Sequence, residues 1–366
     1  MIILSVVKTL IISFNYPPTI GGIETYAKEL HNYFKNVKGV NFLFPSRKKS
    51  SNPIFRGLSL IYFICVSLLK SRSVSYKLVH LTSFNLWFFA YLYSYFNKKC
   101  IFLINIWGLE FVYKNKKGLL PKIYNKIFLD NKILHSSKFY YLVSSEASKN
   151  LLLENGFDQK RIKFIKLGVP ESSIKSSIKS ENPDEKYFLF VGRIIKRKGL
   201  SWFVKNVLPN FPNHRLKVVG PIADKQEFQD SKHGQVDYLG IVTDSELKTL
   251  RENSSVCVIP NIFLENDDDF EAFCFVTIES VASGSIVVAS NYQGIPEALL
   301  NGKLGSLPNP SNVAEWNISI QEVIDLNLNE RQNIIEKRSS LLKKELSWDK
   351  LFKETENLHS ELNSVQ

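Results

Sequence analysis

One stretch of this chain indicates its fold class: Glu271-Ala-Phe-Cys-Phe-Val-Thr-Ile-Glu279 runs into Ser280-Val-Ala-Ser-Gly284 and then Ser285-Ile-Val-Val-Ala-Ser290. The pattern predicts a loop, a short helix that begins near Phe275 and ends at a glycine, and a buried strand. Helices that alternate with buried strands are typical of α/β folds with a parallel sheet. We therefore expect an α/β protein.

The two glutamates of this stretch predict a ligand site. Glu271 precedes the expected helix, and Glu279 lies about one turn inside it. Between them are free backbone N–H groups at the positive end of the helix dipole, which suit a phosphate or diphosphate. Ionised carboxylates accept hydrogen bonds from the hydroxyls of ribose or of a sugar. The pair thus indicates a nucleotide-sugar site, with a plain surface position for Glu279 as the alternative.

Length and composition indicate a soluble protein of two domains. The chain has 366 residues, of which 44% are apolar and 22% charged, as in ordinary globular proteins. Its four cysteines form neither a CxxC pair nor a metal-ligand spacing, which favours reduced thiols in a cytosolic protein. The apolar segment 1–14 lacks a basic leader and a cleavage site, so we expect a first strand there rather than a signal peptide.

A polar, serine-rich linker at residues 172–185 separates two similar halves. In both halves short apolar runs alternate with helical stretches, which predicts parallel sheets built from βαβ units. The expected strands are Thr9–Phe14, Leu78–His80, Cys100–Ile106 and Phe139–Ser144, then Tyr187–Val191, Arg215–Val219, Val236–Leu239, Ser255–Ile259 and Ile286–Ala289. Because ligands bind at the carboxyl ends of such strands, we expect a shared site in a cleft between the halves.

Charge is distributed unevenly along the chain. Residues 1–170 carry 25 Lys and Arg against 7 Asp and Glu, a net charge of +18, and the remainder has a net charge of −6. This asymmetry predicts that the first half meets a polyanion. Two segments, 55–70 and 112–129, mix apolar and basic residues, which favours an anionic membrane surface, with a core helix bearing solvated lysines as an equal alternative. A nucleic-acid partner is not expected, since no nucleic-acid-binding motif accompanies the charge.

Two further segments follow expected strands. Gly21-Gly22 would let the backbone approach a ligand just ahead of a helix. The segment Gly192-Arg-Ile-Ile-Lys-Arg-Lys-Gly199 places four cations at the head of the next helix. Cations there oppose the helix dipole unless an anion binds. This segment therefore favours a phosphate site.

These segments together resemble family 4 of the glycosyltransferases, a retaining group with the GT-B fold. The resemblance covers nearly the whole chain and rests on six motifs in family order: Tyr16-Pro-Pro-Thr-Ile-Gly-Gly-Ile-Glu24, Val191-Gly-Arg193 with Lys198-Gly199, Tyr238-Leu-Gly240, the Glu271 and Glu279 pair, Gly294-Ile-Pro-Glu297, and Ser347-Trp348. It implies two Rossmann-like βαβ domains that face each other across a cleft. It also implies an acceptor-side domain at 1–171, the linker at 172–185, a donor-binding domain at 186–344, and a C-terminal helix at 345–366 that crosses back to the first domain.

The resemblance also implies roles for single residues. Arg193 and Lys198 would bind the donor diphosphate, Glu279 the ribose hydroxyls, and Glu271 the transferred sugar; catalysis would depend on Glu271, Arg193 and Lys198. The other donor-binding positions would be Gly21, Gly22, Phe273, Cys274, Phe275 and Val276, and the acceptor-side positions Glu24, Trp107 and Glu110. This sequence departs from the family where Trp107 replaces a frequent histidine, and where Ala272 and Cys274 replace the usual glycines.

The implied activity is retaining transfer of a sugar from a nucleotide-diphosphate donor to a lipid-linked or polysaccharide acceptor. The implied setting is bacterial surface-glycan synthesis, such as capsule, O-antigen or lipopolysaccharide, on the cytoplasmic face of the inner membrane. No metal or cofactor is expected, and Asp267-Asp-Asp269 is interpreted as part of a variable loop. A nucleotide-sugar epimerase and a non-catalytic, membrane-associated subunit of a glycosyltransferase complex remain as alternatives.

Overall fold

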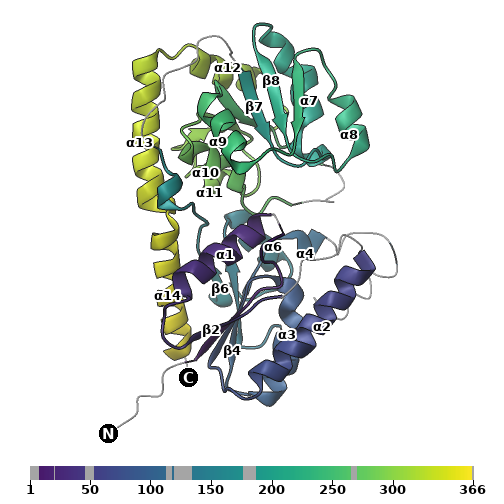
Figure 1. Cartoon of the computed structure of the whole chain (residues 1–366), viewed down its shortest axis with the longest axis vertical. Helices are drawn as coiled ribbons and strands as arrows, with labels where there is room; N and C mark the ends of the chain where they lie inside the picture. Colours follow the sequence, from purple (N-terminus) through teal and green to yellow (C-terminus); the bar gives the residue numbers. More distant parts are fainter. Residues whose placement is uncertain are drawn as a thin grey trace. The chain divides into compact units, whose positions relative to one another are not determined.

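The chain forms two compact units, which are described separately (Figure 1). Unit 1 comprises Met1–Ile165 and Leu351–Gln366, and unit 2 comprises Lys166–Lys350. The computed structural model describes residues 8–19, 21–45, 53–112, 118, 134–175, 187–264 and 270–364. The lysine-rich part of segment 112–129, most of the linker and Asp267–Asp269 lie outside the described residues.

Unit 1 contains a six-stranded parallel sheet in the order β2-β1-β3-β4-β5-β6. Its strands are β1 (Thr9–Ile12), β2 (Val40–Leu43), β3 (Leu78–Leu81), β4 (Ile101–Asn105), β5 (Phe139–Val143) and β6 (Ile162–Phe164). The four central strands match the expected apolar runs. The edge strands β2 and β6 are partly exposed and short, so their sequences carry little of the apolar signal that predicts a strand.

Helices cover this sheet. They are α1 (Gly22–Phe34), α2 (Pro53–Ser71), α3 (Trp87–Phe96), α4 (Leu109–Val112) and α6 (Glu146–Glu154), joined by α14 (Trp348–Ser364) from Leu351 onward. Aromatic residues dominate the core: Trp87, Phe89, Phe102 and Phe139 are each at most 1% exposed. Large aromatic side chains remove much apolar surface from water, which stabilises this layer.

Unit 2 contains a second six-stranded parallel sheet, in the order β12-β11-β10-β7-β8-β9. Its strands are β7 (Tyr187–Val191), β8 (Arg215–Val219), β9 (Val236–Gly240), β10 (Val256–Ile259), β11 (Val287–Ala289) and β12 (Gly305–Ser306). The chain winds from β7 toward one edge of the sheet and then returns to the other side of β7 with β10. The reversal between β7 and β10 is a topological switch point, where open α/β sheets bind ligands.

The helices of unit 2 are α7 (Leu200–Asn206), α8 (Lys225–Asp230), α9 (Asp244–Asn253), α10 (Phe275–Ala282), α11 (Ile295–Ala298), α12 (Val313–Ile324) and α13 (Leu328–Leu346). Two of them begin with a capping box, Thr243 with Glu246 in α9 and Asn327 with Glu330 in α13. Each box satisfies backbone N–H groups that have no partner within the helix. Within the described part of the chain, no helix is long and apolar enough to span a bilayer.

Candidate functional site

The candidate site lies at the carboxyl edge of the unit 2 sheet, at the switch point between β7 and β10. Gly192 and Arg193 follow β7, and Pro260 and Asn261 follow β10. The loop that carries Glu271 then leads from β10 into α10. Parallel strands bring their carboxyl ends to one edge, so residues far apart in the sequence converge here.

Glu271 is the centre of this group. Its side chain is 11% exposed and accepts hydrogen bonds from the guanidinium of Arg197, with Nη1 at 2.5 Å, and from the ammonium of Lys198. The amide of Asn261 donates to the same oxygen, Oε2, at 3.1 Å. Charge-assisted hydrogen bonds of this kind are stronger than those between neutral groups. The buried carboxylate therefore holds two cations in fixed positions.

The charge of Glu271 is stabilised by its neighbours. Burial by itself would raise the pKa of the carboxyl, but the charges of Lys198 and Arg197 outweigh burial and lower the pKa from 4.5 to about 2. The carboxylate therefore stays ionised at neutral pH. A group held in the ionised form is suited to accept hydrogen bonds and to orient cations rather than to donate a proton.

Two glycines allow the backbone of the site to pack closely. Gly199 has a φ of +67°, and a Cβ added to it would lie 1.9 Å from the carbonyl oxygen of Pro260. The N–H of Ile262 donates to the carbonyl of Arg197 at 2.9 Å, which joins the cationic turn to the segment after β10. Gly294 packs as closely, since a Cβ on it would lie 2.0 Å from the carbonyl oxygen of Ala272, and its N–H donates to the carbonyl of Glu271 at 3.0 Å.

The structure places the remaining residues that were expected to bind the donor around the first turn of α10. Cys274 is the N-cap residue, and its side chain makes no capping hydrogen bond. Phe273 and Cys274 are buried, whereas Phe275 and Val276 are half-buried. Burial raises the pKa of the Cys274 thiol to about 11, so the thiol is neutral at physiological pH.

Glu279 and Arg193 occupy more open positions. Glu279 lies on α10 with its side chain 35% exposed, and its Oε2 accepts from Arg251 Nη2 at 2.6 Å. Arg193 and Lys196 are exposed on the segment after β7. This segment was expected at the head of a helix; instead, Lys196–Lys198 form a 3-10 turn, and α7 begins only at Leu200.

The unit 1 residues that were expected to join the site lie at the carboxyl edge of their own sheet. Gly21 immediately precedes α1, and a Cβ on it would lie 2.5 Å from Oε2 of the buried Glu24. Gly22 is the first residue of α1. Trp107 follows β4 and donates from Nε1 to the carbonyl of Thr82 at 2.7 Å.

Glu110 is the ionisable group next to Trp107. Burial raises the pKa of Glu110 to about 7, and the N–H of Trp107 lies 3.5 Å from its Oε1. The carboxyl can therefore exchange a proton near neutral pH. The acceptor-side position that the resemblance implies for Glu110 stays a prediction.

Several residues of this arrangement were not anticipated from the sequence. Arg197 lay within the basic run but was not assigned a partner, and Asn261 and Arg251 gave no signal. In unit 1, His80 and His359 form a buried pair, with His359 Nε2 3.0 Å from His80 Nδ1. The partners are 279 residues apart, and spacing along the chain cannot indicate such contacts.

Residues 172–340 match a family profile described as glycosyl transferases group 1. The match lies within unit 2 and covers less than half of the chain. An uncharacterized glycosyltransferase of Methanocaldococcus jannaschii is 30% identical over 186 residues, which are 48% of this chain and 45% of that protein. The D-inositol 3-phosphate glycosyltransferase of Pseudarthrobacter chlorophenolicus is 27% identical over 50% of this chain and 46% of its own. These matches thus span less than half of either relative.

Two solved structures cover almost the whole chain. Sucrose-phosphate synthase of Thermosynechococcus elongatus superposes with a TM-score of 0.76 at 16% identity, over 98% of this chain and 100% of its own. Anabaena HepE in complex with UDP-glucose gives a TM-score of 0.72 at 13% identity, over 96% of this chain and 99% of its own. These similarities confirm the expected GT-B fold with its two parallel sheets.

Proposed function

We propose that this protein transfers a sugar, with retention of anomeric configuration, from a nucleoside-diphosphate donor. The observation that carries the proposal is the cationic turn held by Glu271 at the switch point of the unit 2 sheet. The segment from Arg193 to Lys198 contains four cations and no carboxylate. A dianionic diphosphate is the natural partner of such a segment, because preorganised positive charge stabilises a departing nucleotide.

The roles within this site follow from exposure and pairing. Arg193 is exposed and suited to contact phosphate oxygens directly, while Glu271 holds Lys198 and Arg197 in place. Glu279 is open enough to accept hydrogen bonds from ribose hydroxyls. The first-turn N–H groups of α10, from Phe275 onward, would contribute further donors to the phosphates or the sugar. Positive charge from side chains makes a metal unnecessary in this proposal.

The proposed acceptor is a lipid-linked glycan of a bacterial surface polysaccharide, at the inner face of the membrane. The net charge of +18 over residues 1–170 supports an anionic lipid surface as the place of work. Glu110, with a pKa of about 7, supports a polar acceptor group at the edge of the unit 1 sheet. UDP-glucose, the donor in the HepE complex, is the first donor to test.

The proposal is tested by incubating the protein with a panel of nucleotide-sugars and following the release of free nucleotide. Slow release of free nucleotide from one donor of the panel would support a transferase that hydrolyses its donor when no acceptor is present. Conversion of the donor to its epimer without nucleotide release would favour an epimerase. Nucleotide-sugar binding without turnover, even with added lipid-linked acceptor, would favour a non-catalytic subunit.

A pair of matched variants separates the two glutamates. Glu279→Gln should weaken the binding of free nucleotide and of nucleotide-sugar together, because both contain ribose. Glu271→Gln should lower turnover even at saturating donor, because it frees Lys198 and Arg197, whose held charge stabilises the departing nucleotide. Isothermal calorimetry and steady-state kinetics measure the two effects, and wild-type turnover in Glu271→Gln would contradict the role assigned to Glu271.

A further inference from the structure

Helix α2 is apolar on two faces. Its inward face packs into the unit 1 core through the buried Phe63 and Ile64, and the ring of Phe63 lies 5.6 Å from that of Phe14. Its outward face is also apolar, since Leu58 is 57% exposed and Tyr62 71% exposed. A helix of a globular protein ordinarily presents polar residues to water. The outward face of α2 is therefore a candidate contact surface.

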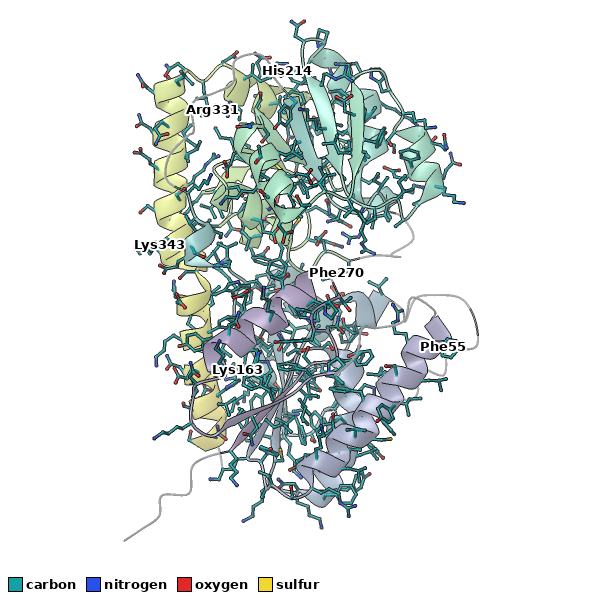
Figure 2. All side chains as sticks on the ribbon, in the orientation of Figure 1. Phe55, Lys163, His214, Phe270, Arg331 and Lys343 are labelled. Atoms are coloured by element: carbon teal, nitrogen blue, oxygen red, sulfur yellow. The ribbon has the colours of Figure 1, made fainter. Side chains whose placement is uncertain are left out.

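This face continues over two helices. α2 lies beside α3 on the outer side of unit 1, and Phe55 marks its first turns in Figure 2. Eight of the fifteen large exposed apolar side chains in the described residues belong to the two helices: Phe55, Leu58, Ile61, Tyr62, Leu69, Phe88, Tyr95 and Phe96. We call this set the α2–α3 face. Clustered exposed apolar residues mark interaction sites, whereas scattered ones need no explanation.

The stretch of sequence that contains α2 and α3 carries charge of one sign. Residues 30–109 contain eleven Lys and Arg and no Asp or Glu. Arg56 and Lys70 lie on α2 and are exposed, and Arg72 lies with Cζ 5.1 Å from the centre of the Phe96 ring. Lys98 and Lys99 follow α3 and are exposed as well. The apolar face is thus bordered by cations.

We propose that the α2–α3 face docks unit 1 onto an anionic lipid bilayer. Apolar side chains would enter the boundary between headgroups and acyl chains, while the bordering lysines and arginines contact lipid phosphates. The exposed tyrosines Tyr62 and Tyr95 suit this boundary, since their rings are apolar and their hydroxyls polar. From Phe55 to Leu69 the face extends along α2 for about 21 Å, at about 1.5 Å per residue.

The cations that border the face favour an anionic bilayer over a second copy of the chain as the partner. A second copy of the chain would bring a second cationic border against the first, and like charges would repel. A bilayer that contains anionic lipids offers negative charge over its whole surface and has no fixed shape to match. This inference rests on the membrane setting of the proposed function but not on the donor chemistry of unit 2, so vesicle binding and nucleotide release can each fail while the other persists.

The first experiment compares two pairs of exposed apolar residues. The full chain is sedimented with phosphatidylcholine vesicles that contain or lack phosphatidylglycerol. Leu58→Ser with Tyr62→Ser should lower binding to the anionic vesicles by about tenfold or more. The control is Ile241→Ser with Ile318→Ser in unit 2, where exposure is similar at 76% and 60%, and it should bind like wild type. Equal losses in both variants, or an absence of wild-type binding, would overturn the proposal.

A second experiment gives a positive signal that does not require a loss of binding. Tyr62→Trp should show a blue shift of its fluorescence when anionic vesicles are added, and brominated lipids should quench it. Ile241→Trp should show neither change. If both variants respond alike, the face is not the docking surface.

Sedimentation velocity tests whether a second copy of the chain, rather than a bilayer, covers the α2–α3 face. Wild type should be monomeric without vesicles, at a protein concentration matched to the binding assay. A wild-type dimer that becomes a monomer in the Leu58→Ser, Tyr62→Ser variant would show that a second copy covers the face, and this would overturn the proposal.

A third experiment removes charge. The variant Lys70→Gln with Arg72→Gln should weaken vesicle binding most at low salt, because salt screens exposed charges over about 10 Å at 0.1 M.

Discussion

Arg193 and Lys196 lie three residues apart on the same cationic segment, and both are exposed. The proposed function gives them different weights, because Arg193 directly follows Gly192 at the end of β7, whereas Lys196 begins the 3-10 turn. Their chemical similarity makes them a matched pair. A comparison of the two therefore tests position rather than charge alone.

Arg193→Ala should lower turnover by about 10²–10³, the usual loss for one preorganised donor that stabilises developing charge. It should also weaken the binding of free nucleotide. Lys196→Ala should change both by far less. Steady-state kinetics and calorimetry measure the two effects, and similar losses in both variants would mean that the segment acts only through its total charge.

Glu271 gives a prediction about pH. Its pKa is about 2 in the folded chain against an ordinary 4.5, so folding favours the ionised form. The resulting stability, about 3 kcal/mol, is fully present above pH 4.5 and is lost as the pH falls toward 2. Glu271→Gln should remove this dependence, so that wild type and variant converge in stability at low pH.

Urea unfolding at stepped pH checks this expectation. Glu322→Gln, which changes an exposed carboxyl on α12, serves as the control and should leave the pH dependence as in wild type. A Glu271→Gln curve parallel to that of wild type would contradict the role of the carboxylate.

At the scale of elements, the turn before α7 and the strand β9 each contain a glycine with nearly the same backbone conformation. Gly199 has a φ of +67° and Gly240 a φ of +66°. Their surroundings differ, because a Cβ on Gly199 would lie 1.9 Å from the carbonyl oxygen of Pro260, while a Cβ on Gly240 would have no atom within 4 Å. Replacing each glycine by alanine therefore separates the cost of backbone strain, which both sites share, from the cost of a steric clash, which only Gly199 has.

Gly240→Ala should cost about 1–2 kcal/mol, the cost of a left-handed conformation for a residue with a Cβ. Gly199→Ala should cost about 3 kcal/mol or more, because the Cβ must also displace a backbone carbonyl. It should weaken nucleotide binding as well, since the turn carries Lys198. Thermal unfolding and calorimetry check both effects, and equal unfolding temperatures would contradict the predicted clash.

At the scale of the whole molecule, unit 1 is completed by helix α14, which is distant in sequence from the rest of that unit. Leu351, Phe352, Leu358 and Leu362 of α14 are each at most 7% exposed. The ring of Phe352 lies 6.4 Å from that of Phe34 of α1. Unit 1 therefore packs against a helix that follows all of unit 2 in the sequence, and its stability depends on that helix.

Removal of residues 351–366 should destabilise unit 1 by roughly 6 kcal/mol or more, since each large apolar side chain contributes about 1.5–3 kcal/mol when buried. That loss is comparable to the whole stability of a domain. Unit 2 should still bind nucleotide. Circular dichroism melts and calorimetry measure these outcomes, and the single variant Leu362→Ala, expected to cost about 2–5 kcal/mol, is a milder test. An unchanged melt in the truncated chain would contradict the prediction.

The sequence by itself determined the α/β class, the central strands of both sheets and the helix that starts at Phe275, because these depend on local apolar periodicity and on glycine. It also predicted one site for the cationic segment and two glutamates; the structure pairs that segment with Glu271, and the place of Glu279 in the site stays a prediction. The sequence did not predict strands β2, β6 and β12. They are short edge strands, partly exposed or of only two residues. Such strands are defined by pairing rather than by composition.

Only the tertiary structure decided which side chains contact one another. It joined Glu271 to Arg197 and Lys198, 74 and 73 residues away, and paired Glu279 with Arg251. It also showed that α2 has an apolar outer face, although the sequence of that segment fits a buried helix equally well. Contacts of this kind depend on how the strands are ordered in a sheet and on which side of a helix meets the core. Those arrangements depend on contacts between segments far apart in the sequence, and no local segment contains that information.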